Sequence, residues 1–232
     1  MRLFRCSDPA QGDLRHAVDT ACIVTPAGNI RTALTVGRTL VSADIPGEML
    51  TLQSGARLAR WSAEGTDTEL LVTPLKPHLP PGMHVDGCVA ALWRVQAVSS
   101  VPRISIECAW NPARPIAEFE GLETGQFLES AAWNIDPLVV QIGTEDNESL
   151  KARAERDEFF PRRVADRLDP SYPSVIRCSY RGLTVRIPDL AAGELMQIQF
   201  IVAWATPAEP TDTSTWSAVD APYRRILEQA HC

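Results

Sequence analysis

Short catalytic signatures are missing from this sequence of 232 residues. It contains no GxSxG nucleophile elbow, no P-loop, no GxGxxG phrase and no HExxH phrase. These phrases mark common hydrolases, nucleotide-binding proteins and zinc proteases, because each places a reactive or phosphate-binding group in a defined local geometry. Their absence argues more strongly against nucleotide-dependent chemistry than against catalysis in general.

Lysine is scarce, with two lysines beside twenty arginines, and the formal net charge is −7. Nucleic-acid binding relies on clustered basic residues that neutralise phosphates. We therefore expect no nucleic-acid partner. A base-composition bias of the gene is the simplest explanation of the arginine excess. The alternative is a local site for carboxylates or phosphates, which the planar guanidinium group binds through two parallel hydrogen bonds.

Long apolar runs are also lacking, and the N-terminal stretch has no signal-peptide pattern. We expect a soluble, cytoplasmic protein without a membrane partner or a cofactor. No CxxC pair is present, which argues against a zinc ribbon and against a thioredoxin-type redox motif. The cysteines are predicted to be six reduced thiols, at Cys6, Cys22, Cys88, Cys108, Cys178 and Cys232.

What the chain does contain is strand periodicity. Apolar and polar residues alternate with a period of two in 83–98, 103–110, 183–187 and 196–204. Prolines and glycines lie scattered between these runs, as turns do between short strands. The sequence predicts an all-β fold, an antiparallel β-sandwich of the Ig-like or jelly-roll-like kind.

A strand-turn-strand phrase occurs twice, at 77–93 and 188–204, with proline, leucine, glycine and tryptophan at matching positions. Such a phrase is common in bacterial β-sandwich modules, and it predicts a tandem repeat or one elongated double unit. The predicted parts are a β-sandwich unit 1–98, a second unit 99–210 with a charged insertion 145–167, and a C-terminal helix 211–232. The alternative is a single β-domain over 1–232.

Two segments have helical features. Asp146 or Asn147 is placed to cap a helix that runs to about Phe160, with oppositely charged residues at helical spacing. The alternative for this segment is a charged loop over one end of the sheets. Near the C-terminus, Asp220 is a candidate N-cap for a helix that packs its apolar stripe on the β core.

The best candidate for chemistry is the row His84, Asp86 and Cys88. On a strand, residues two apart face the same way. Some non-haem iron sites begin with a histidine followed two residues later by an aspartate. The simpler interpretation is the polar face of an alternating strand. The second copy of the phrase supports it, because leucine and two glutamines occupy the matching positions. We predict no metal site.

The candidate binding residues are Arg153, Arg156, Arg163 and Trp216. The arginines belong to a segment whose charges nearly balance, so exposed ion pairs are the simplest interpretation and an anion-binding or docking element is the alternative. Trp216 lies outside any strand-like run and is a candidate surface anchor.

Two functions remain open at this level. The first is a binding or assembly protein that recognises a protein partner or associates with itself, so that it forms an oligomer. The second is a small-molecule enzyme, cofactor-independent or metal-assisted, with a pocket near His84, Asp86 and the arginine-rich segment.

Overall fold

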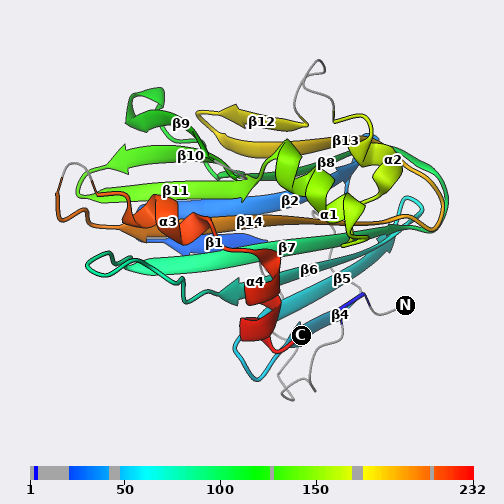
Figure 1. Ribbon diagram of the computed structural model, residues 1–232, viewed down its shortest axis with the longest axis horizontal. Coiled ribbons are helices and arrows are strands. Elements are labelled where there is room, and N and C mark those ends of the chain that lie inside the picture. The colour runs from blue at the N-terminus through cyan, green and yellow to red at the C-terminus, as the bar shows by residue number, and fades with distance from the viewer. Residues whose placement is uncertain (1–2, 5–20, 42–47, 126–127, 169–174, 210–211) are drawn as a thin grey trace.

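A computed structural model describes residues 3–4, 21–41, 48–125, 128–168, 175–209 and 212–232. It shows two antiparallel β-sheets packed face to face, with helices on one outer face (Figure 1). This confirms the prediction of an all-β sandwich with a C-terminal helix. None of the helices in these ranges is long and apolar enough to cross a membrane.

The first sheet has six strands in the order β1-β2-β8-β13-β12, with β3 paired to β2. Its strands are β1 Cys22–Thr25, β2 Gly28–Val36, β3 Thr39–Leu40, β8 Val101–Trp110, β12 Ile176–Ser179 and β13 Gly182–Leu190.

The second sheet has eight strands in the order β4-β5-β6-β7-β14-β11-β10-β9. Its strands are β4 Glu48–Thr51, β5 Arg57–Ala63, β6 Thr66–Pro74, β7 Gly87–Ala97, β9 Phe119–Gly125, β10 Leu128–Ile135, β11 Leu138–Glu145 and β14 Leu195–Ala205.

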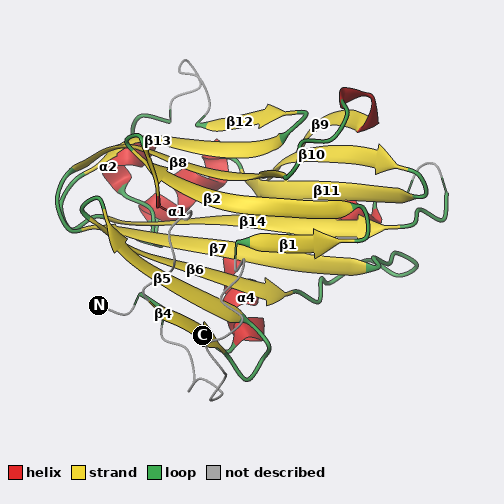
Figure 2. Cartoon of the chain, turned by 180° about the vertical axis from the view of Figure 1, so that it is seen from behind, coloured by secondary structure: helices red, strands yellow, loops and turns green. Residues whose placement is uncertain are grey.

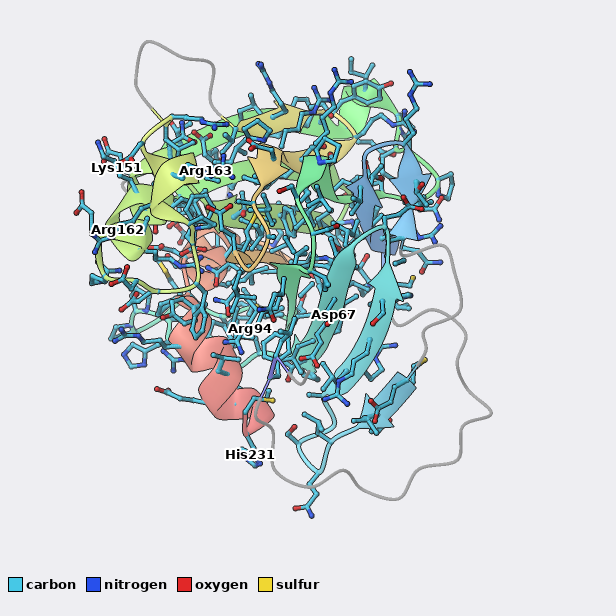
Figure 3. The ribbon with its side chains drawn as sticks, turned by 90° about the vertical axis from the view of Figure 1, so that its right-hand side faces the viewer. Asp67, Arg94, Lys151, Arg162, Arg163 and His231 are labelled. Atoms are coloured by element: carbon cyan, nitrogen blue, oxygen red, sulfur yellow. The ribbon has the colours of Figure 1, made fainter. Side chains whose placement is uncertain are left out.

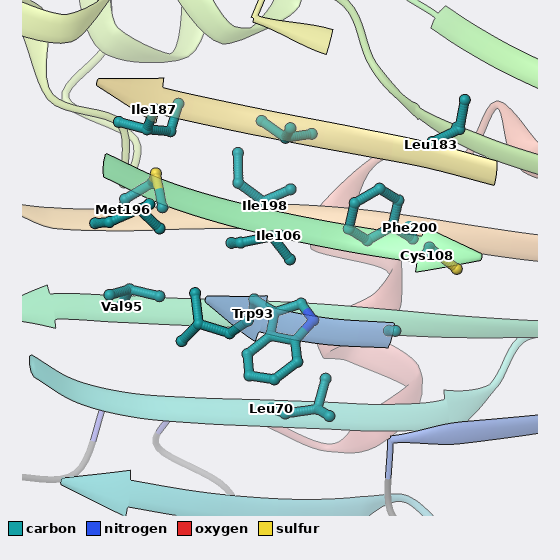
Figure 4. Packing of buried hydrophobic residues seen from close by; sticks show 14 of the residues in the cluster. Leu70, Trp93, Val95, Ile106, Cys108, Leu183, Ile187, Met196, Ile198 and Phe200 are labelled. Carbon is teal, nitrogen blue, oxygen red and sulfur yellow. The ribbon is translucent and has the colours of Figure 1, made fainter. Parts of the chain in front are cut away.

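The main core fills the space between the sheets. Alternate residues of each strand point into it, as the period of two requires. Figure 4 shows Trp93 of β7 among aliphatic side chains from neighbouring strands. The Trp93 ring stacks on Trp61 at 5.7 Å between centroids, and its indole nitrogen donates to Thr32 Oγ1 at 2.6 Å. Both the ring and its polar edge are therefore accommodated inside the sandwich.

Helices cover the outer face of the eight-stranded sheet (Figure 1). The α-helices are α1 Asn147–Glu155, α2 Arg162–Ala165, α3 Ser214–Val219 and α4 Tyr223–Ala230. α3 packs on β11 and β14, and α4 contacts β6 and β7. A second apolar cluster lies between α3, α4 and the sheet, whereas the buried apolar side chains of α1 and α2 belong to the main core.

A row of alternating charge crosses that face. Glu48, Arg60, Glu69, Arg94 and Gln197 are successive cross-strand partners on β4, β5, β6, β7 and β14. Arg60 is bonded to both neighbouring carboxylates, and the Arg94 Nε group donates to Gln197 Oε1 at 2.8 Å. Opposite charges placed directly across adjacent strands support the register of the sheet.

Both sheets combine strands from the two sides of residue 99. β2 pairs with β8 in one sheet, and β7 pairs with β14 in the other. The predicted division at 98 and 99 therefore passes through both sheets, and the separate folding of either part stays a prediction.

The two copies of the repeated phrase meet in the centre of the eight-stranded sheet. Trp93 lies opposite Ile198, and Trp204 lies opposite Gly87, on the antiparallel strands β7 and β14. The preceding segments differ, because Pro188 belongs to a strand of the other sheet whereas Pro77 lies outside any strand. The likeness is therefore confined to the central strand pair.

The helical predictions are confirmed in part. Asp146 caps α1 by accepting a hydrogen bond from the Ser149 backbone N–H at 2.8 Å. The helix ends at Glu155 and not near Phe160, and α2 follows separately. The prediction for Asp220 is wrong, because α4 begins at Tyr223 with Pro222 at its N-cap position. Pro is favoured at the start of a helix, where its missing N–H has no partner to lose.

The prediction of six reduced cysteines is also wrong. Cys22, Cys88, Cys108 and Cys178 are reduced thiols, but Cys232 is disulfide-bonded. Cys6 lies outside the described residues.

Candidate functional site

The structure does not place His84, Asp86 and Cys88 on one strand face as the spacing predicts. β7 begins at Gly87, so His84 and Asp86 lie in the preceding loop. The Asp86 carboxylate accepts the Thr206 backbone N–H at 2.7 Å, and the His84 backbone N–H donates to Ser214 Oγ. These contacts hold the loop.

Cys88 lies inside the fold. Burial raises the pKa of its thiol to about 12, which makes it an inert side chain. In the described ranges, no group of three or more histidine, cysteine, aspartate or glutamate side chains is placed to hold a metal ion.

The arginine-rich segment instead forms one wall of a pocket, which we call the helix-side pocket. This cavity of about 580 Å³ lies between α1 and the start of α4, and its size is typical of small-molecule sites. Its polar lining residues are Glu145, Ser149, Arg153, Arg156, Glu158, Gln199, Asp220, Tyr223 and Arg224.

A buried ion pair lies at the base of the pocket. Arg153 of α1 is 1% exposed, and its Nη1 group donates to Glu145 Oε2 of β11 at 2.5 Å. Its Nε group also donates to the Glu158 carbonyl at 3.1 Å. Its guanidinium carbon lies 4.9 Å from the centre of the Tyr223 ring. The expectation of an exposed, solvated arginine is therefore wrong for Arg153.

Gln199 of β14 supplies a buried amide. Its Nε2 group donates to the Ala221 carbonyl at 3.0 Å, whereas its Oε1 atom has no hydrogen-bond partner among the described residues. The side chain is 4% exposed. A buried acceptor without a donor costs about 1–3 kcal/mol, and a ligand that donates a hydrogen bond would remove this cost.

The pocket rim is charged and accessible. Glu158 accepts hydrogen bonds from both Arg156 and Arg224. These two arginines are 57% and 66% exposed at the side chain. Each guanidinium group has several N–H donors, so both can contact a ligand while they remain paired with Glu158.

Two carboxyl groups of the pocket have raised pKa values. Burial raises the pKa of Glu145, although Arg153 acts in the opposite direction. Partial desolvation also raises the pKa of Asp220, an exposed residue that follows α3. Carboxyl groups with raised pKa values in one cavity are a feature of sites for proton transfer.

Arg163 and Trp216 lie apart from the pocket lining. Arg163 joins α2 to the β13–β14 region, with its Nη1 group 2.7 Å from Asp189 Oδ2 and its Nη2 group 2.8 Å from Glu194 Oε2. The Trp216 ring packs on β9, where a Cβ atom on Gly125 would lie 2.4 Å from the ring. Trp216 is only partly exposed, so its ring is largely used in packing.

Sequence reasoning missed Glu145, Gln199 and Tyr223 as members of one pocket. Gln199 entered that reasoning only as the residue that matches Cys88 in the second copy of the phrase. The usable signal was two glutamines, at 197 and 199, on the polar face of an otherwise apolar strand. Their position beneath a helical layer depends on the tertiary fold.

No protein-family model matches this chain, and no curated protein matches it by sequence. Its fold is similar to part of the solved structure "Putative kojibiose phosphorylase from human microbiome", with a TM-score of 0.50 and 6% sequence identity. The match covers 87% of this chain and 26% of that one, so this chain spans about a quarter of its structural neighbour. At this identity the likeness shows the fold alone.

Proposed function

We propose that this chain is a binding protein and that the helix-side pocket is its ligand site. The observation that carries the proposal is the buried, unpartnered Oε1 atom of Gln199 beside the Glu145–Arg153 ion pair. Polar groups in a well-packed interior are normally satisfied, and each exception calls for a physical explanation. A ligand that donates a hydrogen bond to the Oε1 atom of Gln199 would supply this explanation.

The charge balance of the pocket favours a neutral, polyhydroxylated ligand. Three arginines and three carboxylates line it, so a strongly charged ligand would meet as much repulsion as attraction. A hydroxyl group both donates and accepts hydrogen bonds. Such groups can donate to Gln199 and Glu145 at the base while accepting from Arg156 and Arg224 at the rim.

Catalysis is the second candidate function, and the raised pKa values of Glu145 and Asp220 favour it. In that case the two carboxyl groups transfer protons to and from a small polar substrate. The enzyme hypothesis thereby moves from His84 and Asp86 to the helix-side pocket.

Ligand-observed NMR tests the proposal, with glucose as the neutral probe and ethanolamine and citrate as charged comparators. We expect saturation transfer to glucose, and we expect Gln199→Met to abolish it by removing the acceptor. Gln197→Met is the matched control, because Gln197 is a buried glutamine of the same strand that does not line the pocket. Melting temperatures of both variants establish that they are folded. A signal from citrate alone, or equal loss in both variants, would contradict the proposal.

The expected protein partner, self-association and cellular location remain proposals. Binding of a protein partner, or self-association, is proposed from the exposed arginines at the pocket rim, and gel filtration tests the oligomeric state. The expected cytoplasmic location relied on reduced cysteines. The disulfide at Cys232 argues against that location, because disulfides persist mainly in oxidising compartments.

A further inference from the structure

The outer face of the six-stranded sheet carries a second set of arginines, beside α2 and apart from the helix-side pocket. In Figure 2 this sheet faces the viewer, and α1, α3 and α4 lie behind it. Along its two central strands, small side chains form a lane, with Ser105 and Ala109 on β8 and Gly182 and Thr184 on β13. The exposed carboxylate of Glu107 lies within this lane, opposite Thr184. Larger side chains at its flanks and ends leave two hollows over this lane.

The larger hollow, of about 1020 Å³, is lined by four arginines and one aspartate. The aspartate of the lining is Asp166, whereas Arg167 is paired with Asp189 outside the lining. Arg103, Arg177 and Arg186 are exposed, and their side chains have no hydrogen-bond acceptor or ion-pair partner within the described part of the chain. Among the described lining residues, three unpaired guanidinium groups against the single Asp166 carboxylate make this hollow positive on a protein of net charge −7.

The smaller hollow, of about 410 Å³, continues the positive surface along the same strands. Arg31, Arg181 and Glu107 line it, so arginines outnumber carboxylates by two to one there. The buried Nε atom of Arg31 has no acceptor among the described residues. Ser105 lies opposite Arg186 and Ala109 lies opposite Gly182, so both hollows lie over the β8–β13 pair. At about 3.3 Å per residue, positions 103 to 109 span about 20 Å.

We propose that this arginine face, defined by Arg31, Arg103, Arg177, Arg181 and Arg186, docks an acidic polypeptide segment of a partner protein. An extended segment of about six residues spans about 20 Å, so its carboxylates reach both hollows. A guanidinium group binds a carboxylate through two parallel hydrogen bonds.

The shape and chemistry of the face favour this occupant over other anions. The distance between the hollows exceeds the size of one small anion. Among the described residues that line the two hollows, the one aromatic side chain is Trp110, which is 3% exposed and packs against Trp133, so its ring is not free to stack on the bases of single-stranded nucleic acid. This interaction is separate from the helix-side pocket and does not depend on the function proposed for it.

A labelled hexaglutamate peptide tests the proposal by fluorescence anisotropy at low salt, with hexaserine as the uncharged comparator. We expect hexaglutamate alone to bind, and more weakly as salt rises, because exposed charges are screened. The double variant Arg177→Glu/Arg186→Glu should weaken binding about tenfold, since two attractions become repulsions.

The matched control is Lys76→Glu/Lys151→Glu, which changes the net charge equally at exposed positions outside both hollows; Lys151 is labelled in Figure 3. It should change the affinity less than about twofold, because distant exposed charges are screened. Circular dichroism and melting curves check folding, and Arg186→Gln replaces the double variant if that variant does not fold.

Three results would overturn the docking proposal. Hexaglutamate would fail to bind at low salt, or both double variants would lose affinity equally. In the third, inorganic phosphate would bind in calorimetry while hexaglutamate does not, which would mark a site for small anions only.

Discussion

Arg153 and Glu145 form an ion pair beneath α1, with 2.5 Å between Nη1 and Oε2 and almost no solvent exposure of the arginine. The pair joins the helical insertion to the eight-stranded sheet. Arg153→Ala would leave the Glu145 carboxylate buried without its partner, and breaking such pairs typically costs about 3–5 kcal/mol. We expect a loss of that size in the free energy of unfolding measured with urea.

The control for this prediction is Arg156→Ala, on the same helix but at the exposed rim. We expect no measurable change in stability there, because Arg156 is 57% exposed and Glu158 keeps Arg224 as a second partner. Equal stability of the two variants would show that Arg153 is not a structural anchor.

Asp220→Asn should stabilise the protein near neutral pH. Partial desolvation raises the folded-state pKa of Asp220 above its unfolded value of about 3.9. The folded state therefore binds a proton more tightly, and this stabilisation is lost as pH rises through the folded-state pKa. The gain from Asn should be greatest above that pKa and should vanish below about pH 3.9. Urea denaturation from pH 3 to 7 measures it, and a gain independent of pH would contradict the assignment.

Thiol titration checks the state of the cysteines. In unfolded protein prepared without reductant we expect four reactive thiols, because Cys232 and its partner do not react. Six should react after reduction. In the folded protein Cys88 and Cys108 should react very slowly, since burial raises the pKa of both thiols. Detection of six reactive thiols without reductant would show that Cys232 forms no disulfide.

Arg94→Lys should destabilise the fold although it keeps the charge. The Arg94 guanidinium carbon lies 4.2 Å from the centre of the Phe4 ring and 4.3 Å from that of Phe159. Arg94 is labelled in Figure 3, and burial lowers its pKa to about 10. Lysine cannot stack flat between two rings or keep the bond to Gln197, so we expect a loss of about 1–3 kcal/mol. Arg162→Lys, at an exposed position, is the comparison in thermal denaturation and should be neutral.

The strands were predictable because alternation is a local property. Ile104 and Ile106 share the buried face of β8, and Met196, Ile198 and Phe200 share that of β14, as their spacing requires. The start of β7 was not predictable in the same way. The alternating pattern continues back to His84, but the backbone enters the ladder only at Gly87, so the polar row that the pattern predicted was lost.

The site was less predictable than the fold, because the sequence pattern of a polar strand face is the same whether water or a helix covers that face. Arg153 and Gln199 are polar residues of ordinary appearance in the sequence, and burial beneath α1 and α4 is what gives them a role. Arg163 and Trp216 were predicted as binding residues, and their side chains are engaged within the fold. Sequence spacing reports which residues share a face, and it does not report what packs on that face.

The central position of β14 has a consequence for how the chain folds as it is synthesised. β14 completes the middle of the larger sheet, yet six strands separate it in the sequence from its partner β7. Until residues 195–205 leave the ribosome, the β4–β7 meander has an open edge at its most apolar strand. Open apolar edges recruit other chains. Truncation before Leu195 should therefore yield aggregates, and the yield of native protein should depend on how quickly the last strand arrives.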